Sequence, residues 1–411
     1  MANVSSSNGL EKRPKLHFPS FDEPWEENEL SHYLVENTER NRGLAFGKED
    51  VLSVSGEYGV INQIAFQGRS FAGESVADYH VVETDDIVYT KSPLKANPYG
   101  IIKVNKGIPG IVSTLYAVYH PLNTVAPRFV DLYFANDLRL NKFLKPLVNI
   151  GAKHDMKVNN SFVLTGTVVF PSIGEQQKLV DFFAKLDRRI EAQRKIVDAL
   201  KKYKRGVMQG IFRNMSVVSP SGFETVQLSA IFKKVSRRNN KGEIKNVITN
   251  SAEYGLIPQR DFFDKDIAVD GNTSNYYVIE QGDFVYNPRK SNTAPYGPFN
   301  RYEREERGII SPLYTCLVLQ ANIEPNYLAW YFKSDAWYRY IYDNGSQGVR
   351  HDRVSMTDDL LMGIPVIIPS RDAQIRIANI LDGLEKRLKI ELSHYEHMKT
   401  IRGALLQQLF I

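Results

Sequence analysis

The sequence has little of what several classes of protein require. Its 411 residues contain a single cysteine, Cys316, which excludes an internal disulfide and suits a reducing compartment such as the cytoplasm. No apolar run approaches the roughly 20 residues that a membrane-spanning helix needs. The first residues, Met1–Gly9, are polar and lack the apolar core of a signal peptide, so we expect a disordered tail there. These features predict a cytoplasmic protein without a membrane segment.

Motifs for catalysis, metals and cofactors are also lacking. Gly43–Glu49 is one residue too short between its glycines for a phosphate-binding loop, and Asn287–Lys290 resembles only half of an adenine-methyltransferase signature. The spacing of Glu391, His394 and His397 would suit a metal ion on a helix, but a polar helix face is the simpler interpretation. No Cys/His cluster has zinc spacing, and no serine or cysteine triad can be assembled. We expect no catalytic residue and no bound metal or cofactor.

Composition and charge leave the partner open. With 43% hydrophobic and 24% charged residues, the chain has the composition of a globular protein long enough for two or three domains. Its net charge of +5 and pI near 8.9 are weak evidence for a polyanionic partner. The positions of the basic residues are therefore more informative than their number.

The chain contains an internal duplication. The stretch Glu175–Phe212 returns without a gap as Ala373–Phe410, 198 positions later. Upstream landmarks recur at offsets of 196 to 198: Ser55–Gly59 with Ser251–Gly255, Pro98–Gly100 with Pro295–Gly297, and Gly110–Tyr116 with Gly308–Tyr314. A duplicated half that ends in a long helix predicts a pseudo-symmetric molecule that reads a two-part target.

Both copies of the long stretch have the apolar spacing of a coiled-coil helix. Apolar residues recur at steps of three and four, which predicts a heptad-like seam. The alternative is that each helix lies on its own domain, but 38 residues would form a helix of about 57 Å, longer than a compact domain is wide. We expect the two helices to pair antiparallel. The predicted interface positions are Leu179, Phe183, Leu186, Ile190, Val197 and Leu200 in the first copy, and Ile377, Leu381, Leu384, Leu388, Met398 and Leu405 in the second.

The helix starts differ between the copies. Ser172 and Glu175 fit a capping box at the start of the first helix. The second helix begins at Ser370–Gln374 without the matching glutamate, and Gly383 lies inside it, so we expect the second helix to be looser. A second apolar stripe, which would pack on the parent domain or on another subunit, comprises Phe182, Ile196, Tyr203, Ile380, Ile401 and Leu406.

The regions before each long helix are rich in strand-like runs separated by Gly, Pro and Asn. Helical patterns appear only around Arg128–Lys142 and Tyr327–Tyr342. We predict that each region is an α+β domain with a twisted, mostly mixed sheet. The expected strands are His80–Val82, Ile87–Tyr89, Ile111–Tyr119, Thr167–Phe170, Phe284–Tyr286, Ile309–Leu319 and Ile364–Ile368.

Basic and amide side chains gather in loops at matching places of the two copies. Arg and Lys reach phosphates or guanine edges, Asn pairs with adenine, and aromatic rings pack on bases or sugars. For any single residue a solvated loop is the simpler interpretation, but recurrence in both halves favours DNA binding. The candidate contacts are Lys91, Lys95, Asn97, Tyr99, Lys103, Lys153 and His154 in the first half, and Arg289, Lys290, Asn292, Tyr296, Arg301, Arg350 and His351 in the second.

These features together resemble the specificity subunit of type I restriction–modification systems. The resemblance covers nearly the whole chain after residue 10, and its weight lies in the duplicated order of motifs that are each weak alone. The motifs that carry it are Arg13–Phe18, Trp25-Glu26, Ser113–Tyr116, Pro171 with Glu175–Gln177, Gly282–Asn287, Gln209–Phe212 and Gln407–Phe410.

The resemblance implies an α+β fold of two pseudo-symmetric target recognition domains joined by two long antiparallel coiled-coil helices that act as a ruler. Each domain would read one half of a bipartite site in double-stranded DNA. The implied organisation is a tail (1–19), a first recognition domain (20–170), a first helical region (171–213), a second recognition domain (214–368) and a second helical region (369–411).

The resemblance also implies partners. Two methyltransferase subunits would bring S-adenosylmethionine and methylate adenine, and motor–nuclease subunits using ATP and Mg²⁺ would cut unmodified DNA, while this chain is not itself an enzyme. Two other functions stay open from the residues: a non-catalytic coiled-coil adaptor that binds proteins, and a self-sufficient restriction or methylation enzyme. The missing cofactor and nuclease motifs count against the second.

Overall fold

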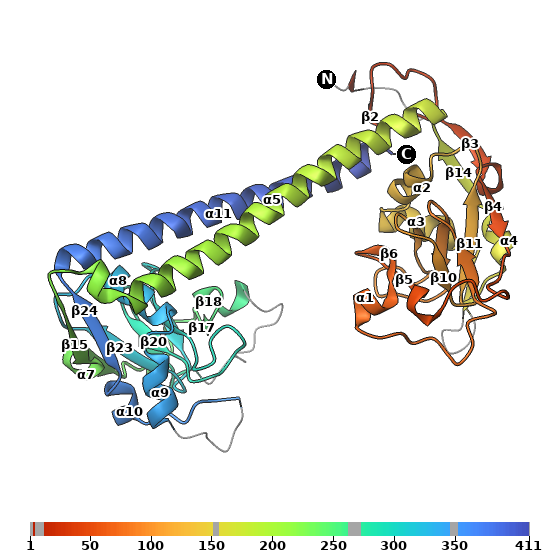
Figure 1. The fold of residues 1–411 in the computed structure, drawn as a ribbon. Helices are drawn as coiled ribbons and strands as arrows, with labels where there is room; N and C mark the ends of the chain where they lie inside the picture. The colour runs from red at the N-terminus through yellow and green to blue at the C-terminus, as the bar shows by residue number, and fades with distance from the viewer. Residues whose placement is uncertain (1–2, 5–11, 151–155, 262–272, 346–351, 411) are drawn as a thin grey trace. The chain divides into compact units, whose positions relative to one another are not determined.

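The computed structural model describes residues 3–4, 12–150, 156–261, 273–345 and 352–410. The chain divides into two compact units. Unit 1 comprises Met1–Arg194 and His394–Ile411, and unit 2 comprises Lys195–Ser393. The two long helices α5 (Ile173–Arg213) and α11 (Arg371–Gln408) each contribute one stretch to both units (Figure 1).

Unit 1 is built mainly of short antiparallel strands. Its largest sheet has the order β4-β11-β8-β9, and smaller two-stranded sheets pair β14 with β3, β10 with β7, and β5 with β6. The described strands are β1 (Asn3–Val4), β2 (Leu16–His17), β3 (Glu26–Glu29), β4 (Leu34–Asn37), β5 (Leu52–Ser55), β6 (Gly59–Asn62), β7 (His80–Val82), β8 (Ile87–Thr90), β9 (Ile102–Val104), β10 (Gly110–Val112), β11 (Tyr116–Pro121), β12 (Asn149–Ile150), β13 (Met156–Lys157) and β14 (Thr167–Phe170).

Helices cover one side of the core of unit 1. Buried aromatic and aliphatic side chains from α2 and α3 pack with strand residues and with the ends of both long helices that belong to this unit. The short helices are η1 (Leu30–His32), η2 (Lys48–Asp50), α1 (Gln63–Gln67), α2 (Pro127–Tyr133), α3 (Asp137–Leu144) and α4 (Asn160–Val163).

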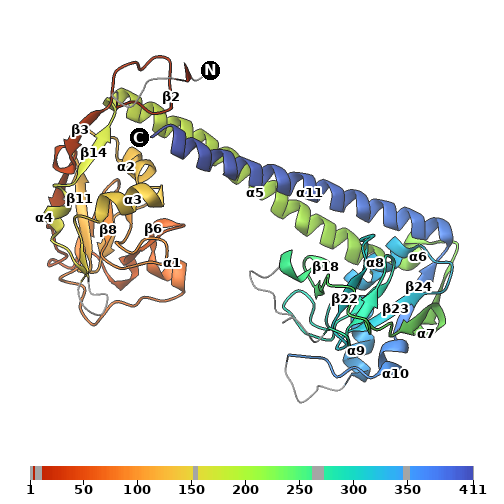
Figure 2. The same cartoon turned by 180° about the vertical axis from the view of Figure 1, so that it is seen from behind.

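Unit 2 repeats the strand pairing of unit 1. Its largest sheet has the order β16-β23-β20-β21, and two-stranded sheets pair β15 with β24, β19 with β22, and β17 with β18 (Figure 2). Its strands are β15 (Phe223–Gln227), β16 (Phe232–Val235), β17 (Ile248–Ser251), β18 (Gly255–Pro258), β19 (Tyr277–Ile279), β20 (Phe284–Tyr286), β21 (Phe299–Arg301), β22 (Gly308–Ile310), β23 (Thr315–Leu319) and β24 (Pro365–Pro369). Its short helices are α6 (Met215–Val218), α7 (Leu228–Ile231), η4 (Gln259–Asp261), α8 (Pro325–Lys333), α9 (Tyr338–Asn344) and α10 (Asp358–Met362).

The α+β class is confirmed, but the prediction of mostly mixed sheets was wrong. Every named strand pair in the described residues is antiparallel, and parallel pairing is confined to the single bridges Val51–Ile111 and Val247–Ile309. A short loop can join only antiparallel neighbours, which accounts for the hairpins β5–β6 and β17–β18, whereas pairs such as β3–β14 and β15–β24 join strands that are distant in sequence.

Several predicted elements are broken in two. The expected strand Ile111–Tyr119 is β10 and β11, separated by a turn in which the Tyr116 N–H donates to the Ser113 carbonyl. The same turn, from Tyr314 to Ser311, separates β22 from β23. The helical pattern Arg128–Lys142 likewise comprises α2 and α3, because the chain leaves the helix at Phe134 and Asn136 caps a new one.

In each unit a stretch of α5 runs antiparallel to a stretch of α11. In unit 1 Asp187 pairs with Arg402, and the Phe183 ring lies 6.0 Å from that of Phe410. The residue closer to the N-terminus of α5 therefore contacts the residue closer to the C-terminus of the chain, as antiparallel pairing requires. In unit 2 Lys204 Nζ lies 2.5 Å from Glu385 Oε2. The antiparallel pairing is the one expected from the shared apolar seam.

The capping prediction for the two helices was wrong in detail. Glu175 points into the core, where its Oε2 accepts a hydrogen bond of 3.1 Å from Trp25 Nε1, so it does not close a capping box with Ser172. The second helix, expected to lack a capping box, still has a serine cap: Ser370 Oγ accepts from the Ala373 N–H at 3.4 Å. The buried tryptophan competes for the glutamate, and the sequence pattern alone does not show this competition.

Candidate nucleic-acid interface

A basic and polar cluster forms where β8 ends in unit 1. Lys91 follows β8 directly, and its Nζ donates to the Asn160 side-chain oxygen at 3.1 Å and to the Thr114 carbonyl at 3.4 Å. Asn160 in turn donates to Glu36 at 2.9 Å. The pKa of Lys91 is lowered by burial and by the positive charge of Arg40, while Glu36 acts in the opposite direction. Lys91 is thus a half-buried cation held by neutral oxygens.

Arg40 is the second cation of this cluster. It bridges to His80 through the backbone, and its Nη1 donates to the Asp78 carbonyl at 2.8 Å. His80 is buried, and its pKa is lowered to about 4 by burial and by the charges of Arg40 and Lys91. At neutral pH the imidazole is therefore uncharged, and the positive charge at this place comes from Arg40 and Lys91.

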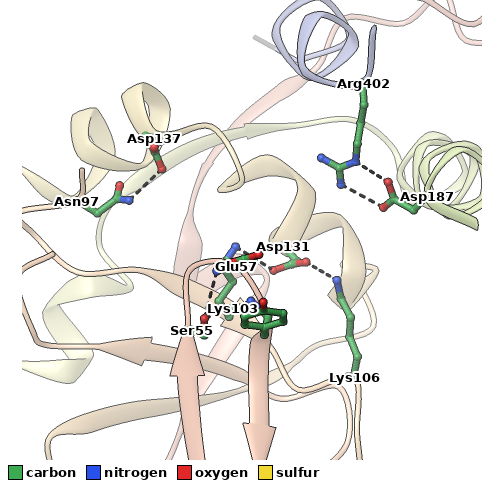
Figure 3. A network of polar contacts seen from close by, with 10 residues as sticks. Ser55, Glu57, Asn97, Lys103, Lys106, Asp131, Asp137, Asp187 and Arg402 are labelled. Carbon is green, nitrogen blue, oxygen red and sulfur yellow. Dashed lines mark hydrogen bonds and ion pairs between the residues drawn. The ribbon is translucent and has the colours of Figure 1, made fainter. Parts of the chain in front are cut away.

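Two other predicted residues of unit 1 are engaged with carboxylates. Lys103 on β9 lies 4.0 Å from Asp131 of α2, and Lys106 lies 2.5 Å from the other oxygen of the same carboxylate (Figure 3). Asn97 is buried and donates to Asp137 at 2.9 Å. These contacts fasten the loop 91–106 to α2 and α3, so Lys103 and Asn97 have a structural role whether or not they also reach DNA.

The same loop conformation is built in both units by a tyrosine and a glycine. The Tyr89 hydroxyl donates to the Tyr99 carbonyl at 2.7 Å, and the Tyr286 hydroxyl donates to the Tyr296 carbonyl at the same distance. Gly100 follows in the left-handed region, with φ of 89°, and a Cβ there would come within 2.0 Å of the Thr90 carbonyl oxygen. Only glycine fits so close an approach.

Arg289, the second-half counterpart of this region, follows β20 and is exposed. Its Nε lies 3.8 Å from Asp352, and the same carboxylate lies 3.8 Å from Nε of Arg353. The Lys290 N–H donates to the Asp352 carbonyl, so the segments 288–290 and 352–354 run side by side. Arg301 faces a different neighbour, and its Nη1 donates to Asn326 at 2.6 Å.

The remaining predicted contacts divide into three groups. Lys95 and Asn292 are exposed loop residues. Tyr99 and Tyr296 are half-buried against the cores of their units, and the Tyr296 ring lies 5.0 Å from that of Tyr338. The other four predicted residues, Lys153, His154, Arg350 and His351, lie outside the described residues.

The prediction from sequence missed three cations of these clusters. Arg40, Arg238 and Arg353 lie outside the predicted loops. The structure places Arg40 near Lys91 and Arg353 beside Arg289, and Arg238 makes a backbone bridge equivalent to that of Arg40. The repeat offers the signal that would have found two of them, because Arg238 lies 198 positions after Arg40. The residues around Arg40 and Arg238 differ in sequence, and a prediction restricted to the three loops does not include either arginine.

The helix positions assigned to the coiled-coil interface are covered to different degrees. Leu179, Phe183, Val197, Ile377, Leu381 and Leu388 are buried, and Leu186, Ile190, Leu200, Leu384, Met398 and Leu405 are half-buried. Of the second stripe, Leu406 and Phe182 pack on the core of unit 1, whereas Ile196, Tyr203, Ile380 and Ile401 are exposed. Their role as an interface to other subunits stays a prediction.

The described residues contain no group of three or more His, Cys, Asp or Glu side chains placed to hold a metal ion. Glu391 accepts a hydrogen bond of 2.7 Å from Arg387 on the same helix. None of the helices among the described residues is long and apolar enough to cross a membrane.

Sequence comparison and structure comparison give different results. No protein-family model and no curated protein matches the sequence. Among solved structures, the type I restriction–modification S subunit from M. genitalium matches with a TM-score of 0.52 at 15% identity, over 97% of this chain and 99% of that one. A chain from a structure of the assembly and conformational transition of a type I restriction–modification system matches with the same TM-score and identity, over 94% and 97%.

Both similarities extend over nearly the full length of both chains, including the two strand-rich units and the long helices. At 15% identity they establish the fold. The chain therefore has the fold of a type I restriction–modification specificity subunit, as its duplicated motifs predict.

Proposed function

We propose that this chain is the DNA sequence-specificity subunit of a type I restriction–modification complex. Each half would read one part of a bipartite site, and partner subunits would methylate adenine there or cut the unmodified DNA. The observation that carries the proposal is the full-length match to an S subunit, 97% of this chain on 99% of that one. A partial match to one domain would support only DNA binding of some kind.

The arrangement within the two units supports this function. Each unit contains the same strand pairing, and each carries a basic side chain in the loop after the equivalent strand, β8 or β20. The side chains themselves differ: Lys91 with Asn160 in one unit, and Arg289 with Asp352 in the other. Corresponding loops with different chemistry are what two half-sites of different sequence require.

S-adenosylmethionine, ATP and Mg²⁺ would be bound by partner subunits in this scheme. The methyltransferase partners would dock on the two long helices, where Ile196, Tyr203, Ile380 and Ile401 leave apolar surface exposed. Exposed apolar side chains on a helix are typical of a surface that another subunit covers.

The direct test is a map of N6-methyladenine across the host genome by long-read sequencing, with and without this gene. The proposal predicts a split motif of two defined halves around a fixed gap, which disappears on deletion. An unchanged map in a strain that expresses the neighbouring methyltransferase would contradict it.

A domain exchange tests the division of labour. Replacing residues 214–368 with the second recognition domain of another specificity subunit should change one half of the motif, and replacing 20–170 should change the other. The two chimaeras are matched controls for each other. A change of both halves in either one would show that the units do not read DNA independently.

A further inference from the structure

We propose that Arg40 with Lys91 in unit 1, and Arg238 and Arg289 in unit 2, are contacts to the phosphate backbone of DNA. The inference rests on the proposed function and goes further, because it assigns a role to named residues, two of them outside the predicted loops. It also separates these contacts from base reading. The evidence is the backbone route that joins the two residues in unit 1, the excess of positive charge in both units and the recurrence of the arginine in the same backbone setting.

The backbone brings the residues of unit 1 together along a continuous path. Arg40 bridges to His80, His80 pairs with Val112 across β7 and β10, and the chain then runs to Thr114, whose carbonyl accepts from Lys91 Nζ at 3.4 Å. The cluster therefore depends on strand register and not on the chance rotamer of a loop side chain. Figure 1 shows β10 near β11 in this unit, and Figure 2 shows β8 beside β11.

Unit 2 repeats the first part of this path. Arg238 bridges to Tyr277, and Tyr277 pairs with Ile310 across β19 and β22, as His80 pairs with Val112. Arg238 Nη1 also lies 3.4 Å from the Asn275 carbonyl, where Arg40 donates to that of Asp78. The arginine is thus fixed by equivalent main-chain partners in both units, although the loops around it differ.

The cations of unit 1 lack a direct counter-charge. Among the described residues no carboxylate forms an ion pair with Arg40 or Lys91, whose side chains donate instead to carbonyl and amide oxygens. The nearby Glu36 is bound to Asn160. Holding two like charges together while burying one of them is unfavourable, and the lowered pKa of Lys91 reflects both effects. An anion placed between the two would remove the repulsion.

Unit 2 has a partial counter-charge. Arg289 and Arg353 share one carboxylate, that of Asp352, at 3.8 Å each, and Arg238 lies over the Tyr277 ring with its guanidinium carbon 5.5 Å from the centroid. Two cations on one carboxylate leave an excess of positive charge, and among the described residues no carboxylate forms an ion pair with Arg238. A phosphodiester suits both places because it carries one negative charge whatever the base sequence.

Base edges are a poorer match for these residues. Arg40 already uses Nη1 on a main-chain carbonyl and Lys91 donates to two oxygens, so both are held by the protein and have fewer donors left for a base edge. Cations positioned by the backbone at the same place in both units are instead suited to hold the duplex in register. The differing loop residues beside them would then read the bases.

The test is the salt dependence of DNA binding by the full chain assembled with its methyltransferase subunits. A fluorescein-labelled duplex of random sequence is titrated at several chloride concentrations with wild type and with the R40Q/K91Q and R238Q/R289Q variants. Each lost phosphate contact should reduce the slope of log K against log salt by about 0.9. Each double variant should therefore lose about 1.8 from the slope.

Matched variants control for the general effects of charge removal and misfolding. K142Q removes one charge from an exposed lysine of α3, outside the cluster, and should leave the slope unchanged. K91R keeps the charge and should keep the slope, and far-ultraviolet circular dichroism checks that each variant is folded. The methylated motif should be the same in all variants that still methylate, because phosphate contacts carry no sequence information.

The outcomes separate this inference from the function on which it rests. If wild type binds no DNA in the assembled complex, the proposed function fails. If wild type binds and the double variants have the wild-type slope, the phosphate assignment fails alone. It fails as well if R40Q/K91Q changes the methylated motif, since the residues would then read bases, or if titration calorimetry finds a site for inorganic phosphate while the DNA slope is unchanged.

Discussion

Arg402 lies against Asp187 in a two-point contact, with Nε 2.5 Å from Oδ1 and Nη2 3.1 Å from Oδ2. Lys204 and Glu385 form the corresponding pair in unit 2. Under the 198-residue offset of the repeat, Asp187 corresponds to Glu385 and Lys204 to Arg402, so the same acid–base contact occurs once in each unit. The polar positions that interrupt the apolar seam are thus paired with each other.

Removing Arg402 should cost more than removing its partner. R402A loses both the ion pair and the packing of the guanidinium 5.8 Å from the Phe183 ring centroid, whereas D187N loses only the charge. We expect D187N to lower the free energy of unfolding by about 0.5–1 kcal/mol, since the pair is partly exposed. The additional loss in R402A is about 0.5–1 kcal/mol for the cation–π contact.

The measurement is hydrogen–deuterium exchange on peptides of unit 1, with a double-mutant cycle for the coupling. The control is K399A, which breaks an exposed pair one turn apart on α11 and should leave the exchange of these peptides close to that of wild type. Equal losses in R402A and D187N would show that the ring contact contributes nothing.

Phe410 anchors the C-terminal end of the repeat in the core of unit 1. Its ring lies 5.7 Å from that of Phe129 and 6.1 Å from that of Trp25, and it is buried. We expect F410A to destabilise unit 1 by about 3–5 kcal/mol because it leaves a cavity among aromatic rings. The equivalent F212A should do the same in unit 2, where Phe212 packs on Tyr327 and Tyr331.

Thermal unfolding with exchange readout by unit distinguishes these variants. Y203A is the control, since Tyr203 is 61% exposed, and it should change stability by no more than about 0.5 kcal/mol. If F410A loosened unit 2 as much as unit 1, the two cores would not be independent.

The long helices were the part of the fold most accurately predicted from sequence. The periodic stretches Glu175–Phe212 and Ala373–Phe410 differ from α5 and α11 by only one or two residues at each end, apart from Phe410, which lies beyond the end of its helix. Apolar residues at helical spacing over many turns are compatible with no other regular secondary structure. The repeat in sequence is matched by equivalent contacts, such as Gln176 donating to the Pro171 carbonyl and Gln374 to that of Pro369.

The candidate site was predicted less completely because its partners are distant in sequence. The residues next to Lys103 in the sequence do not indicate that Asp131 faces it. The network of Figure 3 forms only when α2 packs on β9. Arg40 and Lys91 are 51 positions apart and meet through two other strands. Strand pairing of this kind depends on register, which a single sequence specifies only weakly where strands have two or three residues.

Two glycines should respond in opposite directions to alanine. At Gly297, φ is 86° and a Cβ would approach the Asn287 carbonyl oxygen to 2.0 Å, so G297A should lower stability by more than about 2 kcal/mol. At Gly383, inside α11, no atom lies within 4 Å of the added Cβ, so G383A should raise stability by about 1 kcal/mol. Denaturant midpoints measure both, and a neutral G297A would show that the loop rearranges freely.

Two buried groups of unit 1 give pH effects of opposite sign. Burial raises the pKa of Glu175 from 4.5 to about 7, although the Trp25 hydrogen bond acts against it. The folded state therefore binds the proton more tightly than the unfolded chain, and stability falls as pH rises through this window. The pKa of His80 is lowered from 6.5 to about 4. The stability that the neutral histidine contributes is therefore lost as pH falls from about 6.5 to about 4. Between about pH 4.5 and 6.5 the two contributions offset each other.

Replacing Glu175 with glutamine should expose the histidine effect alone. The glutamine side chain keeps an oxygen to accept from Trp25 Nε1 but cannot ionise, so E175Q should match wild type near pH 4.5 and be more stable by up to about 3 kcal/mol at pH 8. Its stability should rise from pH 4 to 6.5, where that of wild type is nearly flat.

The measurement is urea unfolding of unit 1 across this range, with E74Q, a change at an exposed glutamate, as the control. A profile of E175Q parallel to that of wild type would mean that the buried carboxyl does not titrate in this window.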